Sequence, residues 1–588
     1  MTHRFRFTCT RLLPACALAA LLVGPPGFAP SANAADVTYP GSSLDKSPLW
    51  QAINDCLFPA GSLSDNKVTI NSGNVNGDVY GNDVDAAFSP VSNNTVILSG
   101  GSVGGDILGG ANNGAVTGNK VSISGFGSVL GSVYGGYGAA EGTVSGNNVS
   151  IFDSGSVNRN VLGGYSRSVN SHVIGNTVTI SGGTVRDIYG GQSGKGNALN
   201  NSVTLDGAAS QANVIYGGRV EQGTARENAV VMKNGSVTLG IFGGIATADG
   251  GQAQDNHVTM SGGSVGEHLI GGYVQNGSGA ATGNSVIFNG GSVTENVYGG
   301  RSVNGPAQNN SVTMTNGSAK WLLGGYSNSG DASGNSVNVS GGTLSGGVNG
   351  GETTSGNATG NSVDFSNVTA TYVQGGYSGS GSATGNSLAI RSGTVQNNAF
   401  GGYVDSGSGE ASGNSVTFNG GSVTNNIYGG MSAAGLAQSN SVIMTNGSAN
   451  WLLGGYSDSG DVSGNSVNVS GGTLTGVSGG ESNSGSATGN IVSISGGTVQ
   501  SNVNGGFVAS GSGKATGNIV NISGNTDLST ATVAGGISSS DAFTGNTLNK
   551  NSDAAVHIAR NFASVIFGYS GTANIGELDS TPTGSALS

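Results

Sequence analysis

From Asn66 onward the chain repeats one pattern of apolar and polar positions. Each copy reads N-x-V-x-I-x-G-G-x-V, followed by a short variable stretch, V-Y-G-G and a polar loop that leads to the next Asn. Alternation of apolar and polar residues over a few positions is typical of β-strands with one buried face. The pattern therefore predicts three short strands in each copy, separated by turns rich in Gly, Asn and Ser.

The copies recur every 25 to 29 residues, which indicates a repeat protein and not a string of separate domains. A fixed motif with a variable interval places the insertions in loops, while the strands keep their register. The marker Asn occurs at positions 66, 94, 119, 147, 176, 201, 228, 256, 284, 310, 335, 361, 386, 414, 440, 465, 490, 518 and 546.

Three short strands cannot bury an apolar face alone, whereas stacked copies share one interior. The sequence thus predicts an all-β fold, a parallel β-helix (solenoid) of about 19 coils, in which each strand pairs with its equivalents above and below. A β-propeller is the alternative, but its blades need about 40 residues and four strands. Equivalent Asn side chains are expected to form a structural ladder of amide hydrogen bonds. The ladder positions are Asn176, Asn201, Asn228, Asn256 and Asn284.

Aromatic residues precede the Gly-Gly pair in many copies and form a column along the repeat. Such a column either packs between coils or offers rings on which a glycan stacks. Leucine or isoleucine interrupts it in several copies, which favours packing. The tyrosines of this possible aromatic strip are Tyr134, Tyr189, Tyr216, Tyr298 and Tyr428.

A second level of repetition is a block of five coils. Residues 271–350 closely match residues 401–480, as GNSVIFNGGSVTENVYGG and GNSVTFNGGSVTNNIYGG illustrate. A block copied with so little change suits a protein whose length matters more than any single residue.

The composition agrees with an ordered β-protein. Glycine supplies 112 of the 588 residues and charged residues only 9%, against about a quarter in an ordinary helical or α/β enzyme. The formal net charge is −12 and no basic cluster occurs, so we expect no nucleic-acid partner.

The N-terminus has the pattern of a secretory signal. Three arginines lie among the first eleven residues, an apolar run covers 12–23, and an A-x-A cleavage site occupies 32–34. Residues 1–34 are therefore predicted to be a signal peptide that directs export. The mature chain then divides into an N-terminal cap (35–65), the repeat region (66–548), and a C-terminal cap and tail (549–588).

Parallel β-helices also carry polysaccharide lyases and hydrolases, which need two or three neighbouring carboxylates. Glu352 and Glu481 share a column after Gly-Gly. Asp331 and Asp461 share a loop position. Both pairs arise from the five-coil duplication, so their members are separated by roughly 24 Å at about 4.8 Å per coil. We expect isolated, solvated loop acids, and no catalytic residue, metal site or cofactor.

The signal peptide, the repeat and the closing segment FGYSGTANI at 567–575 together resemble the passenger domains of Gram-negative autotransporters (type V secretion). The resemblance covers residues 36–588. It implies a right-handed β-helix that is exported to the cell surface, remains associated with the outer membrane or is released. It also implies an adhesin or a self-association factor in aggregation and biofilm formation, whose partners are host or bacterial surface glycans or proteins, or another copy of the chain.

One feature departs from that group. No ten-residue alternating strands with aromatic girdles follow Ile575, so we expect the outer-membrane translocator barrel to be absent from this chain. Either the reading frame is truncated or the translocator is a separate chain. The sequence favours a non-enzymatic adhesive passenger, with a polysaccharide lyase or hydrolase and a passive surface spacer as alternatives.

Overall fold

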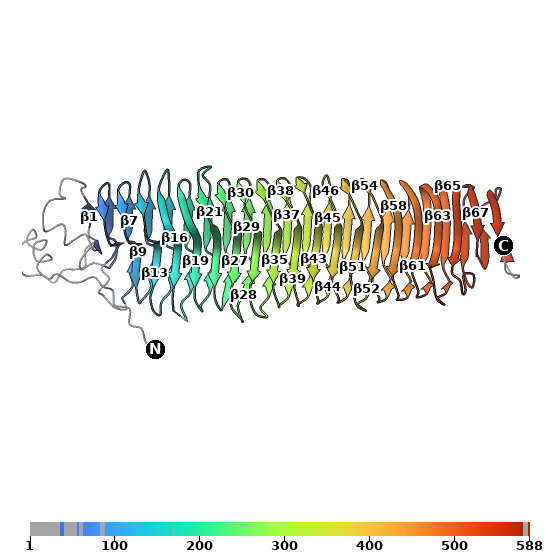
Figure 1. Cartoon of the computed structure of the whole chain (residues 1–588), viewed down its shortest axis with the longest axis horizontal. Coiled ribbons are helices and arrows are strands. Elements are labelled where there is room, and N and C mark those ends of the chain that lie inside the picture. The colour runs from blue at the N-terminus through green and yellow to red at the C-terminus, as the bar shows by residue number, and fades with distance from the viewer. Residues whose placement is uncertain are drawn as a thin grey trace, which may run out of the picture. The chain divides into compact units, whose positions relative to one another are not determined.

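The computed structural model describes residues 36–39, 56–57, 63–82, 89–168, 170–579 and 586–587. All regular structure in these residues is β-strand, and no helix occurs among them (Figure 1). The chain divides into two compact units, residues 1–267 and 268–588. Each unit is a parallel β-solenoid, with about 19 turns in the two together, which confirms the predicted fold class.

One turn of the second unit shows how each copy of the repeat folds. β33 (Ser285–Phe288) carries the N-x-V-x-I motif, β34 (Ser292–Val293) follows the Gly-Gly turn, and β35 (Val297–Ser302) contains V-Y-G-G. A fourth strand, β36 (Ala307–Gln308), lies in the loop that leads to the next turn. The prediction of three strands per copy is therefore wrong by one, because β36 has a single buried Ala within a polar loop.

Equivalent strands of consecutive turns pair in parallel and in register. β33 pairs with β37 (Ser311–Met314), so that Val286 lies beside Val312. In the first unit, β11 (Lys120–Ile123) pairs with β15 (Asn148–Ile151) in the same way. The apolar side chains of these strands are almost completely buried, and the column positions therefore share one dry interior in each unit.

The marker Asn of each turn lies inside the solenoid, and Asn310 shows how its hydrogen-bonding capacity is used. The Oδ1 atom of Asn310 accepts from the backbone N and from Nδ2 of Asn284, at 3.0 and 2.9 Å. Its Nδ2 atom donates to the Ala281 carbonyl and to Oδ1 of Asn335, at 2.9 and 3.0 Å. Because buried polar groups must be satisfied, this arrangement allows an amide column inside an apolar core.

The same bonds join successive marker residues from Asn66 to Asn256 in the first unit and from Asn284 to Asn546 in the second. All of these side chains are 0 or 1% exposed. A Cβ atom on Gly300, the second glycine of V-Y-G-G, would collide with the side chain of Asn310. The two halves of the repeat motif are thus coupled, since the glycine leaves the space that the Asn fills.

At both ends the described strands stack like those of the repeat. β1 (Asp36–Tyr39) pairs with β3 (Lys67–Ile70). β2 (Cys56–Leu57) pairs with β5 (Asp78–Tyr80). The strands after the last marker Asn also pair in parallel, and they are β66 (Thr547–Lys550), β67 (Val556–Arg560), β68 (Ser564–Phe567), β69 (Ile575–Asp579) and β70 (Ala586–Leu587). The predicted signal peptide, residues 1–34, lies outside the described residues.

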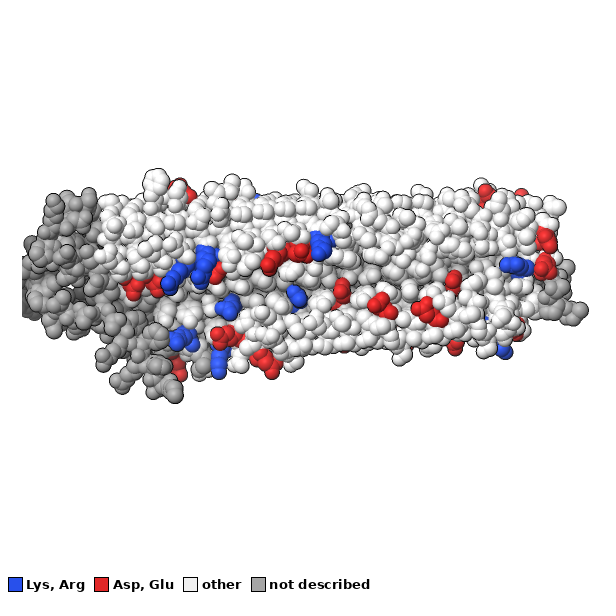
Figure 2. All heavy atoms as spheres, viewed as in Figure 1, with Lys and Arg blue, Asp and Glu red and all other residues white. Residues whose placement is uncertain are grey.

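Charged side chains are sparse on the face shown in Figure 2. Ion pairs join consecutive turns, as Lys233 with Asp206 at 2.8 Å and Lys320 with Glu295 at 3.0 Å. A search of the described residues for an apolar helix of membrane-spanning length finds none.

Candidate ligand-binding groove

A groove with a cavity volume of about 630 Å³ lies on the second unit. Its floor is formed by the long V-Y-G-G strands of six consecutive turns, which pair in parallel. These strands are β35, β39 (Leu322–Ser327), β43 (Val348–Thr353), β47 (Val373–Ser378), β51 (Ala399–Val404) and β55 (Ile427–Ser432).

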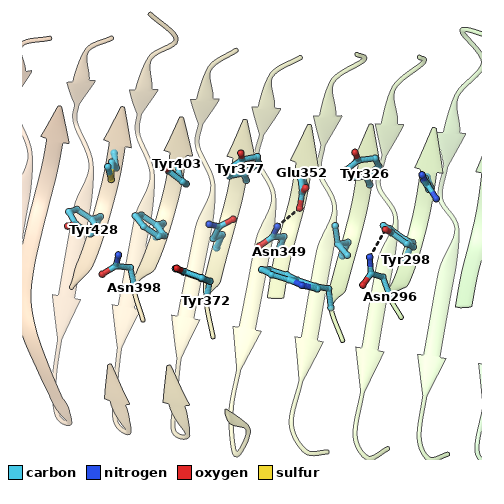
Figure 3. Close-up of a pocket in the computed structure, with 16 residues that line it drawn as sticks. Asn296, Tyr298, Tyr326, Asn349, Glu352, Tyr372, Tyr377, Asn398, Tyr403 and Tyr428 are labelled. Carbon is cyan, nitrogen blue, oxygen red and sulfur yellow. Dashed lines mark hydrogen bonds between the residues drawn. The ribbon is translucent and has the colours of Figure 1, made fainter. Parts of the chain in front are cut away.

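The side chains that line the groove form three columns that run from turn to turn (Figure 3). The residues just before Gly-Gly form the first column, which is Tyr298, Leu323, Asn349, Gln374, Phe400 and Tyr428. The residues just after Gly-Gly form the second, which is Arg301, Tyr326, Glu352, Tyr377, Tyr403 and Met431. The third, from the segments before the strands, is Asn296, Trp321, Tyr372 and Asn398. Each turn therefore contributes to the same columns, but the side chains at these positions differ from turn to turn.

The indole of Trp321 owes its place in the groove to two glycines of the next turn. A Cβ atom on Gly346 or on Gly347 would collide with the indole ring. The glycine pair gives this turn no side chain of its own in the third column, and the ring occupies that space.

Polar groups gather in the turns of β35 and β43. The side-chain Nδ2 of Asn349 donates to the Glu352 carboxylate, and Nδ2 of Asn296 donates to the Tyr298 hydroxyl at 2.8 Å. The Oδ1 atoms of both Asn side chains are buried without a hydrogen-bond partner, and so is Nε of Arg301. Leaving such a group unpaired costs about 1–3 kcal/mol. Three of them line one groove, so water or a ligand in the groove would supply the missing hydrogen bonds.

The guanidinium of Arg301 is surrounded by tyrosine rings. Its Cζ atom lies 5.1 Å from the ring centroid of Tyr273, 5.4 Å from that of Tyr298 and 5.6 Å from that of Tyr326. These distances are within the range of cation–π interactions, which hold the positive charge against the groove wall.

Burial raises the pKa of Glu352, and the hydrogen bond from Asn349 opposes the shift. Glu352 and its counterpart Glu481 lie on strands β43 and β61 (Thr473–Ser482), and neither side chain is in an exposed loop. The expectation of solvated loop acids is therefore wrong for both. Asp331 and Asp461 do lie in exposed loop positions, as expected.

Aromatic rings dominate the other end of the groove. The ring of Phe400 stacks on Tyr403 at 4.7 Å and on Tyr428 at 5.1 Å, with interplanar angles of 13° and 8°. Tyr377 meets Tyr403 edge to face at 5.5 Å, and burial raises the pKa of Tyr377 to about 12. All these hydroxyls stay protonated near neutral pH. The Tyr403 hydroxyl donates to the carboxylate of Asp405 at 2.5 Å, and Asp405 itself does not line the groove.

The predicted aromatic strip is divided between the two units. In the first unit, Tyr189 and Tyr216 stack at 5.0 Å, and Tyr216 continues the stack to Phe242 at 5.2 Å. Tyr134 of that unit packs edge to face on a neighbouring tyrosine. In the second unit, Tyr298 and Tyr428 line the groove at its two ends and are 6 and 9% exposed. Packing accounts for the first three tyrosines, and the last two also contact a cavity.

The Asn ladder and the groove are separate parts of the structure. Asn176, Asn201, Asn228 and Asn256 are joined in the interior of the first unit, and Asn284 begins the ladder of the second. None of these residues lines the groove. Within the described ranges, no group of three or more His, Cys, Asp or Glu side chains lies close enough to hold a metal ion.

Reasoning from the sequence missed Asn349, Gln374 and Arg301, and it interpreted Glu352 as a solvated loop acid. A signal was present, because the two positions that flank Gly-Gly become columns once the copies are aligned by the marker Asn. No known protein family, curated protein or solved structure matches this chain.

Proposed function

We propose that this protein is an exported, non-enzymatic binding protein of the autotransporter-passenger type, which adheres to a cell-surface ligand. The groove of the second unit supports this proposal most directly. It combines aromatic rings with buried polar atoms that have no partner within the chain. A surface of that composition binds a ligand by stacking and hydrogen bonding.

The lining of the groove favours binding over catalysis. Glu352 is its only carboxylate, whereas hydrolysis of a glycosidic bond uses a pair of carboxyl groups about 5–10 Å apart. A polysaccharide lyase or hydrolase is therefore the second candidate. A passive spacer, the third, gives no reason for buried unpaired polar groups in a groove.

Adhesion is tested by coating beads with the full chain and scoring the binding of the beads to bacterial and host cells and their mutual aggregation. We expect coated beads to bind or aggregate, and albumin-coated beads to do neither. Coated beads that behave like the albumin control would contradict the proposal. Release of new reducing ends from polysaccharides incubated with the chain would identify the enzyme instead.

A further inference from the structure

We propose that the groove of the second unit binds a linear, uncharged polysaccharide that runs along the stack of turns. Its sugar rings lie against the aromatic side chains, and its hydroxyls bond to the amide groups. The inference rests on the proposed function and adds to it the class of ligand, its direction and the residues that hold it.

The direction of the ligand follows from the register of the strands. Tyr326, Glu352 and Tyr377 occupy one column on three consecutive turns, and equivalent positions continue to both sides. Neighbouring parallel strands are about 4.8 Å apart. The length of one pyranose unit in an extended chain is close to this spacing. Consecutive sugars along the solenoid axis would therefore meet consecutive turns in equivalent positions.

The unpaired polar atoms fit hydroxyl groups. Oδ1 of Asn296 and Oδ1 of Asn349 need a donor, and Nε of Arg301 needs an acceptor. A sugar hydroxyl supplies both roles, since it donates one hydrogen bond and accepts others. The amide of Gln374, 7% exposed, lies in the same column as Asn349 and extends this polar row by one turn.

The aromatic side chains fit the other surface of a sugar. A pyranose ring presents a face of C–H groups, which packs on aromatic rings because it is apolar and slightly positive against the negative face of the ring. At one end of the groove, the ring of Tyr403 contacts Tyr377 of the preceding turn and Phe400 of its own turn. Hydroxyl-binding groups thus line one end and stacking groups the other.

The charges of the groove favour an uncharged ligand. Arg301 and Glu352 are the only charged residues in its lining. The guanidinium is held among three tyrosine rings, and the carboxyl group already resists ionisation because it is buried. A uronic-acid polymer would bring one carboxylate per sugar next to Glu352 with a single cation to compensate.

Other macromolecules fit less well. A peptide that binds by adding a strand needs free backbone groups at a sheet edge, but β39 is already paired with β35 and β43 on its two sides. Nucleic acid needs a cluster of basic side chains, and the groove has one Arg.

Trp321 lines the groove and can report binding. In the full chain, Trp50 and Trp451 are replaced by Phe, so that fluorescence comes from Trp321 alone. The protein is titrated with neutral hexasaccharides of glucose, mannose and N-acetylglucosamine in β-1,4 and β-1,3 linkage, and with hexagalacturonate. We expect saturable binding of at least one neutral hexamer, and binding of hexagalacturonate about tenfold weaker or absent. Tighter binding of hexagalacturonate, or no binding of any neutral hexamer, would overturn the inference.

Two variants test the residues. Tyr377→Ala removes a stacking ring, and Asn349→Ser introduces the residue present at the equivalent turn, Ser478. We expect each to weaken binding about tenfold or more. The matched control is Tyr216→Ala, which removes a stacked ring from the first unit and should leave the affinity unchanged. Circular dichroism verifies that all three variants keep the β-fold.

Equal affinity in Tyr377→Ala and Tyr216→Ala would exclude this groove as the glycan site. If Tyr377→Ala instead abolishes association between copies in sedimentation, the occupant is a second chain and the inference fails. Bead adhesion that persists without hexamer binding contradicts this inference and leaves the proposed function standing. Hexamer binding without bead adhesion contradicts the proposed function and leaves this inference standing.

Discussion

The duplicated blocks 271–350 and 401–480 have the same interior and different outer surfaces. Asn335 and Asn465 occupy equivalent turns, are completely buried and make the same ladder bonds. On the outer face, Arg301 is replaced by Met431 at the equivalent position. The comparison indicates that stacking constrains the interior of each turn, whereas the positions beside Gly-Gly are free to acquire a ligand site.

The difference is largest at the turn of the two buried glutamates. Glu352 accepts a hydrogen bond from Asn349. In the second block Ser478 stands in place of that Asn, and its hydroxyl donates to the Gly480 carbonyl at 3.2 Å. Without an amide donor, burial raises the pKa of Glu481 to about 7. One substitution therefore changes the polar lining of this turn and removes the hydrogen bond that opposes the rise in the pKa of the carboxyl group.

The strongest test of the common interior is the pair Asn335→Ala and Asn465→Ala. Each removes one residue from the ladder and leaves several buried partners unsatisfied. We expect a loss of about 3–5 kcal/mol in the free energy of unfolding for either variant. Urea unfolding followed by circular dichroism measures it. If the loss for one variant were less than about half of the loss for the other, the two interiors would not be equivalent.

The second test concerns the ionisation of Glu481. Because its pKa in the folded chain is about 7, above the ordinary 4.5, stability is greatest below about pH 4.5 and falls as the pH rises to about 7. Glu481→Gln removes this loss, so the variant should be more stable than the parent at pH 8 by up to about 3 kcal/mol. Thermal midpoints at pH 5 and pH 8 measure the effect.

The control for that experiment is Asp461→Asn, which removes an exposed carboxylate from the same unit. It should leave the pH dependence of the midpoint unchanged. If Glu481→Gln is as pH-dependent as the parent, the carboxyl group is not buried as described.

Ser478→Asn tests whether an amide donor at this position lowers the pKa of the buried glutamate. An Asn at this position should donate to Glu481 as Asn349 does to Glu352, which lowers the pKa of Glu481. We expect the loss of stability between pH 5 and pH 8 to shrink by about 1 kcal/mol. An unchanged or larger loss would mean that the shape of this turn, and not the amide, sets the pKa.

The smallest effect on stability is expected at a position where the first block has an ion pair and the second block has two Asn side chains. Glu295 and Lys320 pair at 3.0 Å in the first block, and Asn425 and Asn450 stand at the equivalent positions of the second. The double variant Glu295→Asn with Lys320→Asn should change the free energy of unfolding by less than about 0.5 kcal/mol, since exposed ion pairs contribute little. A larger change in urea unfolding would show that this pair stabilises the first block specifically.

The fold could be predicted from the sequence because its determinants recur in every copy. The valine columns, the marker Asn and the Gly-Gly pair each appear often enough to stand out from the variable residues. The fourth strand of each turn, such as β36, was not predicted because it has a single small buried residue within a variable polar loop. That strand is defined by its pairing with the preceding and the next turn.

The groove could not be predicted in the same way, because a ligand site breaks the repeat. Asn349, Gln374 and Glu352 stand where most other turns have an aromatic or aliphatic residue, and such polar residues are too few in each column to form a pattern. Interruption of the aromatic column by leucine favours packing, yet Leu323 of that column lines the groove between polar and aromatic neighbours. Burial of Glu352 and Glu481 depends on the side chains of adjacent turns, which lie about 25 residues away in the sequence.

The Asn ladder has a polarity. Each marker residue donates its backbone N–H and one Nδ2 hydrogen toward the C-terminal side, whereas its Oδ1 accepts from the N-terminal side and its other Nδ2 hydrogen donates to a carbonyl on that side. Every cut between whole turns therefore leaves the same two complementary sets of donors and acceptors, and every inserted segment of whole turns carries the matching sets. Recombination can lengthen or shorten such a protein in steps of entire turns without creating a mismatched junction.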